Sequence, residues 1–252
     1  MAQYHTLKEN FDRSLLTFDP IKHRHFYDGR QLYGVTTVLG IISKGDGLIQ
    51  WGVNQAVDYV NSQLQNGLEG LGLDDVQTIL AGAKYAWRGA RQEAADIGTM
   101  AHNWIEGHLK GSQEDFPEHP QARNSCEAAL KWLEQHKWKT IDVEKQVCLP
   151  SLNIGGICDW WAYIDGVPAV PDWKTSKGIY SSYRYQTAVY AKAIEAETGE
   201  RVRERWILRI DKNTGEFEDL HLPASELPAD FKAFKNAAEL YHREQELKKG
   251  SR

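Results

Sequence analysis

Two aspartates lie at equal distances from an Asp-Gly dipeptide in the second half of the chain. Asp165-Gly166 separates two runs rich in β-branched and aromatic residues, a pattern typical of a β-hairpin with a two-residue turn. Such a turn sets Ile164 opposite Val167, and the same register sets Asp159 opposite Asp172. We therefore expect the two aspartates to be direct cross-strand partners, with Cβ atoms roughly 5 Å apart.

Like charges directly opposite each other destabilise a sheet, so a bound divalent cation is the simplest reason for this pair. Two carboxylates suit Mg²⁺ or Mn²⁺, and the backbone carbonyl of Trp173 could supply a further oxygen. Lys174 lies on the same face as Asp172, where its ammonium would stabilise charge that develops on a phosphate. A metal that activates water beside a cation favours phosphodiester hydrolysis. The alternative for so short a motif is a surface ladder of Asp–Lys salt bridges.

Residues around this hairpin favour a functional site over such a ladder. Gly155-Gly156 begins the first strand where a bend or a close backbone approach is expected. Thr175-Ser176 ends the second strand with hydroxyls that can bind phosphate. Gln186 and Tyr190 share one face of the next helix, because they are four residues apart. Their order along the chain makes a chance combination difficult to accept.

Two positions add to the same constellation. His102 and Glu106 share one face of an earlier helix, again at a spacing of four residues. Pro171 removes a backbone donor beside Asp172, so this strand is expected to lack a ladder bond there or to sit at a sheet edge. An opening at that point would leave Asp172 accessible to a substrate.

The remaining pattern predicts an α+β fold that positions these residues. From residue 98 to residue 210 the expected order is α–β–β–β–α–β, a core with a small mixed sheet. In the first of its strands, Ile141, Val143, Val147 and Leu149 are expected on one side and Glu144 on the other. The expected helices are 48–64, 74–89, 98–109, 117–136, 183–198 and 227–249, and the expected strands are 26–33, 141–149, 155–164, 167–175, 203–210 and 216–220.

The predicted organisation has three parts. We expect residues 1–97 to form a helical N-terminal subdomain with a short hairpin, residues 98–220 to form the core, and residues 221–252 to form a C-terminal helix and tail. No linker rich in Pro, Gly or Ser separates these parts, so one compact unit is expected.

Composition narrows the class of protein. The 252 residues carry a net charge of −5, which argues mildly against a large protein surface that binds nucleic acid. Basic residues nevertheless gather locally, and each gathering can also be an ordinary solvated face. The three clusters are Lys22-His23-Arg24-His25 with Arg30; Lys84, Arg88 and Arg91; and Arg201, Arg203, Arg205 and Arg209.

The cysteines and the apolar segments indicate a cytoplasmic protein. Cys126, Cys148 and Cys158 are far apart and have no zinc-binding spacing, which favours a reducing compartment. The N-terminus has no apolar run, so no signal peptide is expected. No segment approaches the roughly 20 apolar residues that a membrane span needs, so no membrane association is expected.

Taken together, the motifs resemble those of the PD-(D/E)XK nuclease superfamily. The resemblance is closest to its RecB-like exonuclease branch, which includes stand-alone phage enzymes and the mitochondrial genome maintenance exonuclease. It runs from about residue 33 to residue 210, and Tyr33-Gly34 stands where Pro-Ser is often seen. The matching motifs are Gly98-Thr99-x-x-His102, Glu144, Gly156-x-x-Asp159, Asp172-Trp173-Lys174-Thr175-Ser176 and Gln186-x-x-x-Tyr190, with Val35-Thr36-Thr37-Val38-Leu39 and Trp51 as a weaker N-terminal match.

The resemblance implies a restriction-endonuclease-like αβββαβ core and a role for each matching residue. Some relatives hold an iron–sulfur cluster with four cysteines, but this chain has three without suitable spacing, so no cluster is expected. By the resemblance, His102, Asp159, Asp172 and the Trp173 carbonyl would bind Mg²⁺ or Mn²⁺, Lys174 would position the attacking water, Glu144 would act behind the ligands or through water, and Gln186, Tyr190, Thr175 and Ser176 would support the site or touch the DNA backbone.

We therefore expect a metal-dependent deoxyribonuclease, an exonuclease that acts on DNA ends in replication, recombination or repair. Asp159, Asp172 and Lys174 are its expected catalytic residues. DNA that is single-stranded or has free ends is the expected substrate, and replication or recombination proteins are possible partners. The alternatives are an endonuclease or an RNA nuclease on the same fold, or a catalytically silent DNA-binding or recombination-partner protein.

Overall fold

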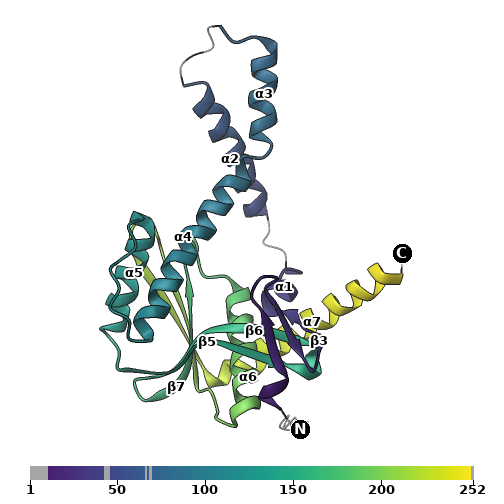
Figure 1. The fold of residues 1–252 in the computed structure, drawn as a ribbon, viewed down its shortest axis with the longest axis vertical. Coiled ribbons are helices and arrows are strands. Elements are labelled where there is room, and N and C mark those ends of the chain that lie inside the picture. Colours follow the sequence, from purple (N-terminus) through teal and green to yellow (C-terminus); the bar gives the residue numbers. More distant parts are fainter. Residues whose placement is uncertain (1–10, 43–45, 66, 68–69, 251–252) are drawn as a thin grey trace. The chain divides into compact units, whose positions relative to one another are not determined.

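The structure of the chain is a computed structural model that describes residues 11–42, 46–65, 67 and 70–250 (Figure 1). It divides into two compact units: the first joins Met1–Ile42 with Ala101–Arg252, and the second is Ser43–Met100. This division differs from the predicted boundaries, because the segment before residue 43 contributes a strand and a helix to the main sheet and its core. The N-terminal segment for which no signal peptide is expected lies mostly in residues 1–10, outside the described residues.

Helices and strands follow the predicted order, and the α+β class is confirmed. The described helices are α1 (Val35–Leu39), α2 (Asp46–Gln63), α3 (Leu73–Ala83), α4 (Ala86–Leu109), α5 (Pro120–Leu133), α6 (Ser181–Thr198) and α7 (Leu227–Gly250). The described strands are β1 (Leu16–Asp19), β2 (Arg24–Tyr27), β3 (Arg30–Gln31), β4 (Tyr33–Gly34), β5 (Trp138–Leu149), β6 (Ile154–Ile164), β7 (Val167–Lys174), β8 (Glu204–Ile210) and β9 (Phe217–Pro223). Short 3-10 turns are η1 (Arg13–Leu15), η2 (Pro150–Leu152) and η3 (Ala224–Glu226).

Six strands form the main sheet, which mixes parallel and antiparallel pairs as predicted. Its order is β4-β6-β7-β8-β9, with β5 paired to β6. β4 and β6 are parallel, as are β7 and β8, whereas the β5–β6, β6–β7 and β8–β9 pairs are antiparallel. The hairpin between β6 and β7 has the predicted two-residue turn, since Asp165 and Gly166 both have positive φ (52° and 83°) and Ile164 pairs with Val167.

One edge of β6 is open in the middle. β5 pairs with β6 from Ile154 to Ile164, so the other strands must share the opposite edge. On that edge β4 pairs with residues 154–155 and β7 with residues 162–164. Beyond Ala169, β7 no longer pairs with β6, whereas its pairing with β8 on the other edge continues to Lys174. The strands therefore separate around Asp159, and Pro171 lies past the end of the β6–β7 ladder, as its missing donor requires.

The alternation of side chains reverses at the same place. Cys158 packs into one hydrophobic cluster, whereas Trp160, two residues later, packs into the cluster on the opposite side of the sheet. The neighbouring strand reverses with it, because Val143 and Val147 also lie in different clusters. Glu144 between them has a left-handed backbone (φ 53°). The prediction that Val143 and Val147 share one side is therefore wrong. It assumed a regular strand in which side chains alternate without interruption, and the backbone at Glu144 interrupts this alternation.

Helices cover both faces of the main sheet, in a helix–sheet–helix arrangement (Figure 1). On one face, α1, α6 and α7 pack against residues such as Ile154 and Val170. On the other face, the last third of α4 and all of α5 pack against Trp160, Trp173 and Leu208. Side chains of β6 and β7 are thus enclosed on both sides, so a polar residue there needs a specific partner.

A small three-stranded sheet, β1-β2-β3, lies beside the start of β6. Its predicted hairpin is present, since Asp28 and Gly29 both have positive φ between β2 and β3. His25 of β2 is buried and lies so close to Gly155 that a Cβ at this glycine would stand 2.8 Å from the His25 Cβ. This close approach explains the first glycine of the Gly155-Gly156 pair.

The second unit contains α2, α3 and the first part of α4. α2 and α3 pack where Gly82 lets the Tyr59 ring approach. Several apolar residues at helical spacing in this unit are exposed, among them Val53, Val57 and Leu80. Helical spacing predicted correctly that these residues lie in helices, but it does not show which part of the chain, if any, packs against them. None of the helices in the described ranges combines the length and the apolar character that crossing a membrane would need.

Candidate functional site

Asp159 lies where β6 and β7 separate, and its carboxylate bridges the opening. Asp159 Oδ2 accepts a hydrogen bond from the backbone N–H of Trp173 at 3.0 Å. The predicted direct pairing of Asp159 with Asp172 is wrong, because the β6–β7 ladder ends at Ala162 and Ala169. The register of the turn was predicted correctly, but the ladder with β6 ends before β7 reaches Asp172, whereas the pairing of β7 with β8 on its other edge continues to Lys174. The two aspartates are linked through the backbone of Trp173 instead.

Asp172 is fully buried (0% exposed) at the centre of the sheet. Its Oδ2 forms an ion pair with the Lys174 ammonium, and no hydrogen bond of normal geometry reaches this oxygen from the described residues. Burial raises the pKa of Asp172, as does the nearby charge of Asp159, while Lys174 opposes the shift. Burial would lower the pKa of Lys174, but the two aspartates raise it overall, so its ammonium form is favoured.

His102 of α4 approaches Asp159. Its Nδ1 lies 3.7 Å from Asp159 Oδ2. Burial lowers the pKa of His102 despite the raising effect of Asp159, because desolvation disfavours the charged ring. The neutral imidazole that results is the form that binds metal ions.

Glu144 reaches the same region from β5. It lies between the pairs Val143–Trp160 and Lys145–Cys158, which places it opposite Asp159. Burial, together with the charges of Asp159 and Glu106, raises the pKa of Glu144 to about 7. Glu144 therefore adds a further carboxyl group beside Asp159.

Gln186 and Tyr190 of α6 lie on the face of the sheet below Asp172. Gln186 Nε2 is 3.5 Å from Asp172 Oδ1 and donates a hydrogen bond to the Tyr190 hydroxyl at 2.9 Å. The Tyr190 ring packs so closely on Gly156 that a Cβ there would lie 2.8 Å from Cε1. Both predicted helix residues are thus near the site, and the second glycine is explained by this ring contact.

The segment after Lys174 is held by a basic residue of β8. Arg209 donates hydrogen bonds from Nε to the Ser176 carbonyl (2.9 Å) and from a terminal nitrogen to the Lys177 carbonyl (3.1 Å). The Ser176 hydroxyl donates to the Gly178 carbonyl within the turn, and half-buried Thr175 directly follows Lys174. The Ser176 hydroxyl that was predicted to bind phosphate is therefore engaged within its own loop.

Sequence reasoning did not identify Tyr183. The Lys174 Nζ lies 5.2 Å from the centre of the Tyr183 ring, in a cation–π contact. Tyr180 packs edge-on against the same ring at 5.5 Å and holds it in place. Tyr183 precedes Gln186 by three residues, so helical spacing from the known motif could have indicated it.

The donor types at this site fit a hard divalent cation, since carboxylate oxygens predominate. Asp159 contacts His102 and the Trp173 backbone, whereas Asp172 contacts Lys174. One oxygen of each aspartate, Oδ2, is thus engaged by the Trp173 N–H or by Lys174, and within the described residues no group of three or more His, Cys, Asp or Glu side chains forms a ligand cluster. These residues thus have suitable donor atoms for a divalent cation. A bound metal would have to replace the Trp173 N–H and the Lys174 ammonium as partners of the aspartate oxygens.

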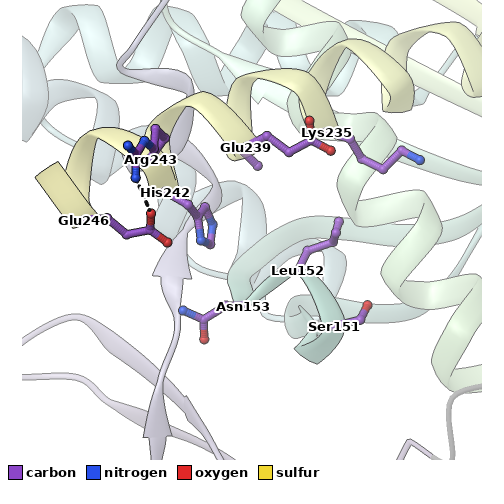
Figure 2. A pocket seen from close by; sticks show the side chains of 9 residues that line it. Ser151, Leu152, Asn153, Lys235, Glu239, His242, Arg243 and Glu246 are labelled. Carbon is purple, nitrogen blue, oxygen red and sulfur yellow. Dashed lines mark hydrogen bonds and ion pairs between the residues drawn. The ribbon is translucent and has the colours of Figure 1, made fainter.

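A separate pocket of about 400 Å³ lies between η2 and α7. Figure 2 shows His242 and Arg243 on α7 and Ser151, Leu152 and Asn153 on the facing loop. None of the candidate-site residues lines this pocket. The candidate site is defined by the separated strands and not by this pocket.

Comparison with known proteins leaves the chain without an assigned family. No family model matches the sequence, and no curated protein matches it. Among solved structures it is similar to one named "Putative exonuclease" from Eubacterium rectale, with 17% sequence identity and a TM-score of 0.38. The similarity covers 55% of this chain and 64% of that one. Similarity at this level assigns neither a fold family nor an activity to the chain.

Proposed function

We propose that the chain is a metal-dependent deoxyribonuclease of the PD-(D/E)XK type that hydrolyses phosphodiester bonds at DNA ends. The observation that carries this proposal is the buried Asp172–Lys174 ion pair beside Asp159, at the point where β6 and β7 separate. A buried carboxylate and ammonium are costly unless they are paired, so their position in an opened sheet supports a functional role.

The element order supports the restriction-endonuclease-like core that the motifs imply. After α4 and α5, strands β5, β6 and β7 are followed by α6 and β8. His102 comes from α4, Asp159 and Asp172 from β6 and β7, and Gln186 from α6. The motifs therefore converge on one place although they are spread over more than eighty residues of sequence.

Each residue has a role in this proposal. His102, Asp159, Asp172 and the Trp173 carbonyl would hold Mg²⁺ or Mn²⁺, and the metal would supply Lewis-acid stabilisation of phosphate charge. Lys174 would orient a water molecule and stabilise charge on the phosphate oxygens. Gln186 would fix the Asp172 carboxylate through its contact with Oδ1. Glu144 would act behind the ligands or through water.

The decisive experiment measures nucleotide release from DNA with Mg²⁺ or Mn²⁺ and with EDTA. We expect release that requires metal and that is lost in Asp172→Ala and Lys174→Ala, while circular dichroism confirms that both variants fold. Linear single-stranded DNA should be degraded and closed-circular single-stranded DNA should not, if the enzyme is an exonuclease. Absence of release by the wild-type protein from every DNA and RNA substrate would favour a catalytically silent nucleic-acid-binding protein.

A further inference from the structure

A second feature that could bind nucleic acid lies outside the candidate site, at the junction of α3 and α4. We call it the basic–aromatic patch, and it consists of Lys84, Tyr85, Trp87, Arg88 and Arg91. Lys84, Tyr85, Arg88 and Arg91 are exposed, and Trp87 is half-buried. All five residues belong to the second unit, Ser43–Met100.

Cations and aromatic rings contact one another within the patch. The Tyr85 ring lies 4.6 Å from the Arg88 Cζ and 5.7 Å from the Lys84 Nζ. The Arg88 Cζ also lies 5.6 Å from the Trp87 ring, so this guanidinium contacts two aromatic side chains. These cation–π contacts order long side chains that would otherwise move freely, and they hold the positive charges close together.

Helix stability does not explain this arrangement. Lys84, Arg88 and Arg91 are the only lysines and arginines between residues 46 and 100, although this stretch carries seven acidic residues: Asp46, Asp58, Glu69, Asp74, Asp75, Glu93 and Asp96. No ion pair joins the three cations to a carboxylate in the described part of the chain. Arg88 lies in the first turn of α4, where the helix dipole disfavours a positive charge. The positive charge of this stretch is thus concentrated at the patch, where the described residues form no ion pair with it.

We propose that the basic–aromatic patch binds single-stranded nucleic acid. Its three cations would contact successive phosphates, and the Tyr85 and Trp87 rings would stack on unpaired bases. A polyanion without exposed rings, such as an acidic membrane surface, would use the cations alone. The contacts between rings and cations therefore favour a partner that has both phosphates and accessible base faces.

This inference goes beyond the proposed function, because none of the patch residues belongs to the candidate site. Binding can be measured in EDTA, where hydrolysis is not needed. Hydrolysis of a small phosphodiester such as bis(p-nitrophenyl) phosphate tests the candidate site alone. The two proposals can therefore fail independently of each other.

The first test measures the salt dependence of binding to a fluorescent single-stranded 20-mer by anisotropy in EDTA. The patch variant carries Lys84→Gln, Arg88→Gln and Arg91→Gln. With about 0.7 counterions released per phosphate contact on single strands, the slope of log K against log salt should fall by about 2. Affinity at low salt should fall at least tenfold, while metal-dependent hydrolysis of bis(p-nitrophenyl) phosphate stays unchanged.

The matched control carries the same change of charge at three other exposed lysines. Lys131→Gln, Lys139→Gln and Lys232→Gln alter residues that are exposed and lie outside the patch. We expect this variant to keep the wild-type slope. An equal loss of affinity and slope in both triple variants would overturn the proposal, because it would show a general effect of net charge.

The second test separates the rings from the charges. Tyr85→Leu should weaken single-strand binding roughly 5-fold or more at an unchanged salt slope, and Tyr85→Phe should retain wild-type affinity. Duplex DNA of the same length should not respond to Tyr85→Leu. Equal affinity of the Leu and Phe variants would overturn the stacking role. Binding to phosphatidylserine vesicles that depends on the three cations, with oligonucleotide binding unaffected by them, would assign the patch to a membrane surface instead.

Discussion

The side chain of Asp159 replaces a missing ladder bond between two strands. Its Oδ2 accepts the Trp173 N–H at 3.0 Å, across the place where β6 has no backbone partner on that edge. One carboxylate therefore connects the opening of the sheet to the residue between Asp172 and Lys174. This relationship predicts that a mutation can remove the negative charge of Asp159 while the hydrogen bond from the Trp173 N–H is kept.

Asp159→Asn should abolish most activity without unfolding the protein. The amide oxygen can still accept the Trp173 N–H, whereas the negative charge is lost. Removing one electrostatic group of a catalytic site typically costs roughly 100-fold or more in rate, and we expect a fall of that size. The measurement is metal-dependent nucleotide release, together with the midpoint of urea unfolding.

Asp165→Asn provides the control for this charge removal. Asp165 accepts the Lys137 N–H in the hairpin turn, away from the candidate site, and asparagine tolerates its left-handed backbone. Activity should remain close to that of the wild-type protein. Full activity of Asp159→Asn, or an equal loss in Asp165→Asn, would contradict the role given to Asp159.

Tyr183→Leu should lower kcat more than it raises KM. The ring faces the Lys174 ammonium at 5.2 Å, and a cation–π contact of about 0.5–2 kcal/mol corresponds to roughly 2- to 30-fold in rate. Tyr183→Phe keeps the ring and should retain most of the rate. Steady-state kinetics on a labelled oligonucleotide provide the test, and a Phe variant as slow as the Leu variant would show that the ring does not position Lys174.

Gly156→Ala should destabilise the fold by about 1–3 kcal/mol, because the added methyl group meets the Tyr190 ring and Val35. The measurement is the free energy of unfolding from urea titration. Gly178→Ala is the matched control, since a Cβ there would have no heavy atom within 4 Å. It should change stability by less than about 0.5 kcal/mol. Equal stability of the two variants would mean that the sheet and α6 can move apart at Gly156 without cost.

Stability should fall in mild acid because His25 is buried as a neutral ring. Burial lowers its pKa from 6.5 to about 4, with a smaller contribution from His23. The unfolded chain therefore binds more protons between these values, so stability is full above pH 6.5, falls as the pH drops from 6.5 to 4, and is constant below. The loss from this group alone is on the order of 3 kcal/mol.

His25→Leu isolates this contribution from that of the carboxylates. We expect the variant to lose less stability than the wild-type protein between pH 7.5 and pH 4.5, as measured by urea unfolding at each pH. His221→Leu, at an exposed histidine of β9, is the matched control for the removal of an imidazole. The same pH slope in the wild-type protein and in His25→Leu would show that His25 can be protonated without cost.

Much of the fold could be predicted from local signals. The Asp165-Gly166 turn, the glycine that ends α6 and the order of elements all follow from backbone preferences and periodicity. The same signals could not locate the division into two units. They also could not show that β4 joins the main sheet, because a pair of two residues carries almost no pattern.

For the candidate site, the sequence by itself determined which residues are present, their types and the turn register that begins the β6–β7 ladder. Only the tertiary structure decided that this ladder stops at Ala169 while β7 continues as the parallel partner of β8, a strand that lies far away in sequence. It also decided that Asp159 contacts the Trp173 backbone instead of Asp172, and that Tyr183 faces Lys174. Local spacing specifies a register, but long-range pairing determines how far along the strands that register holds.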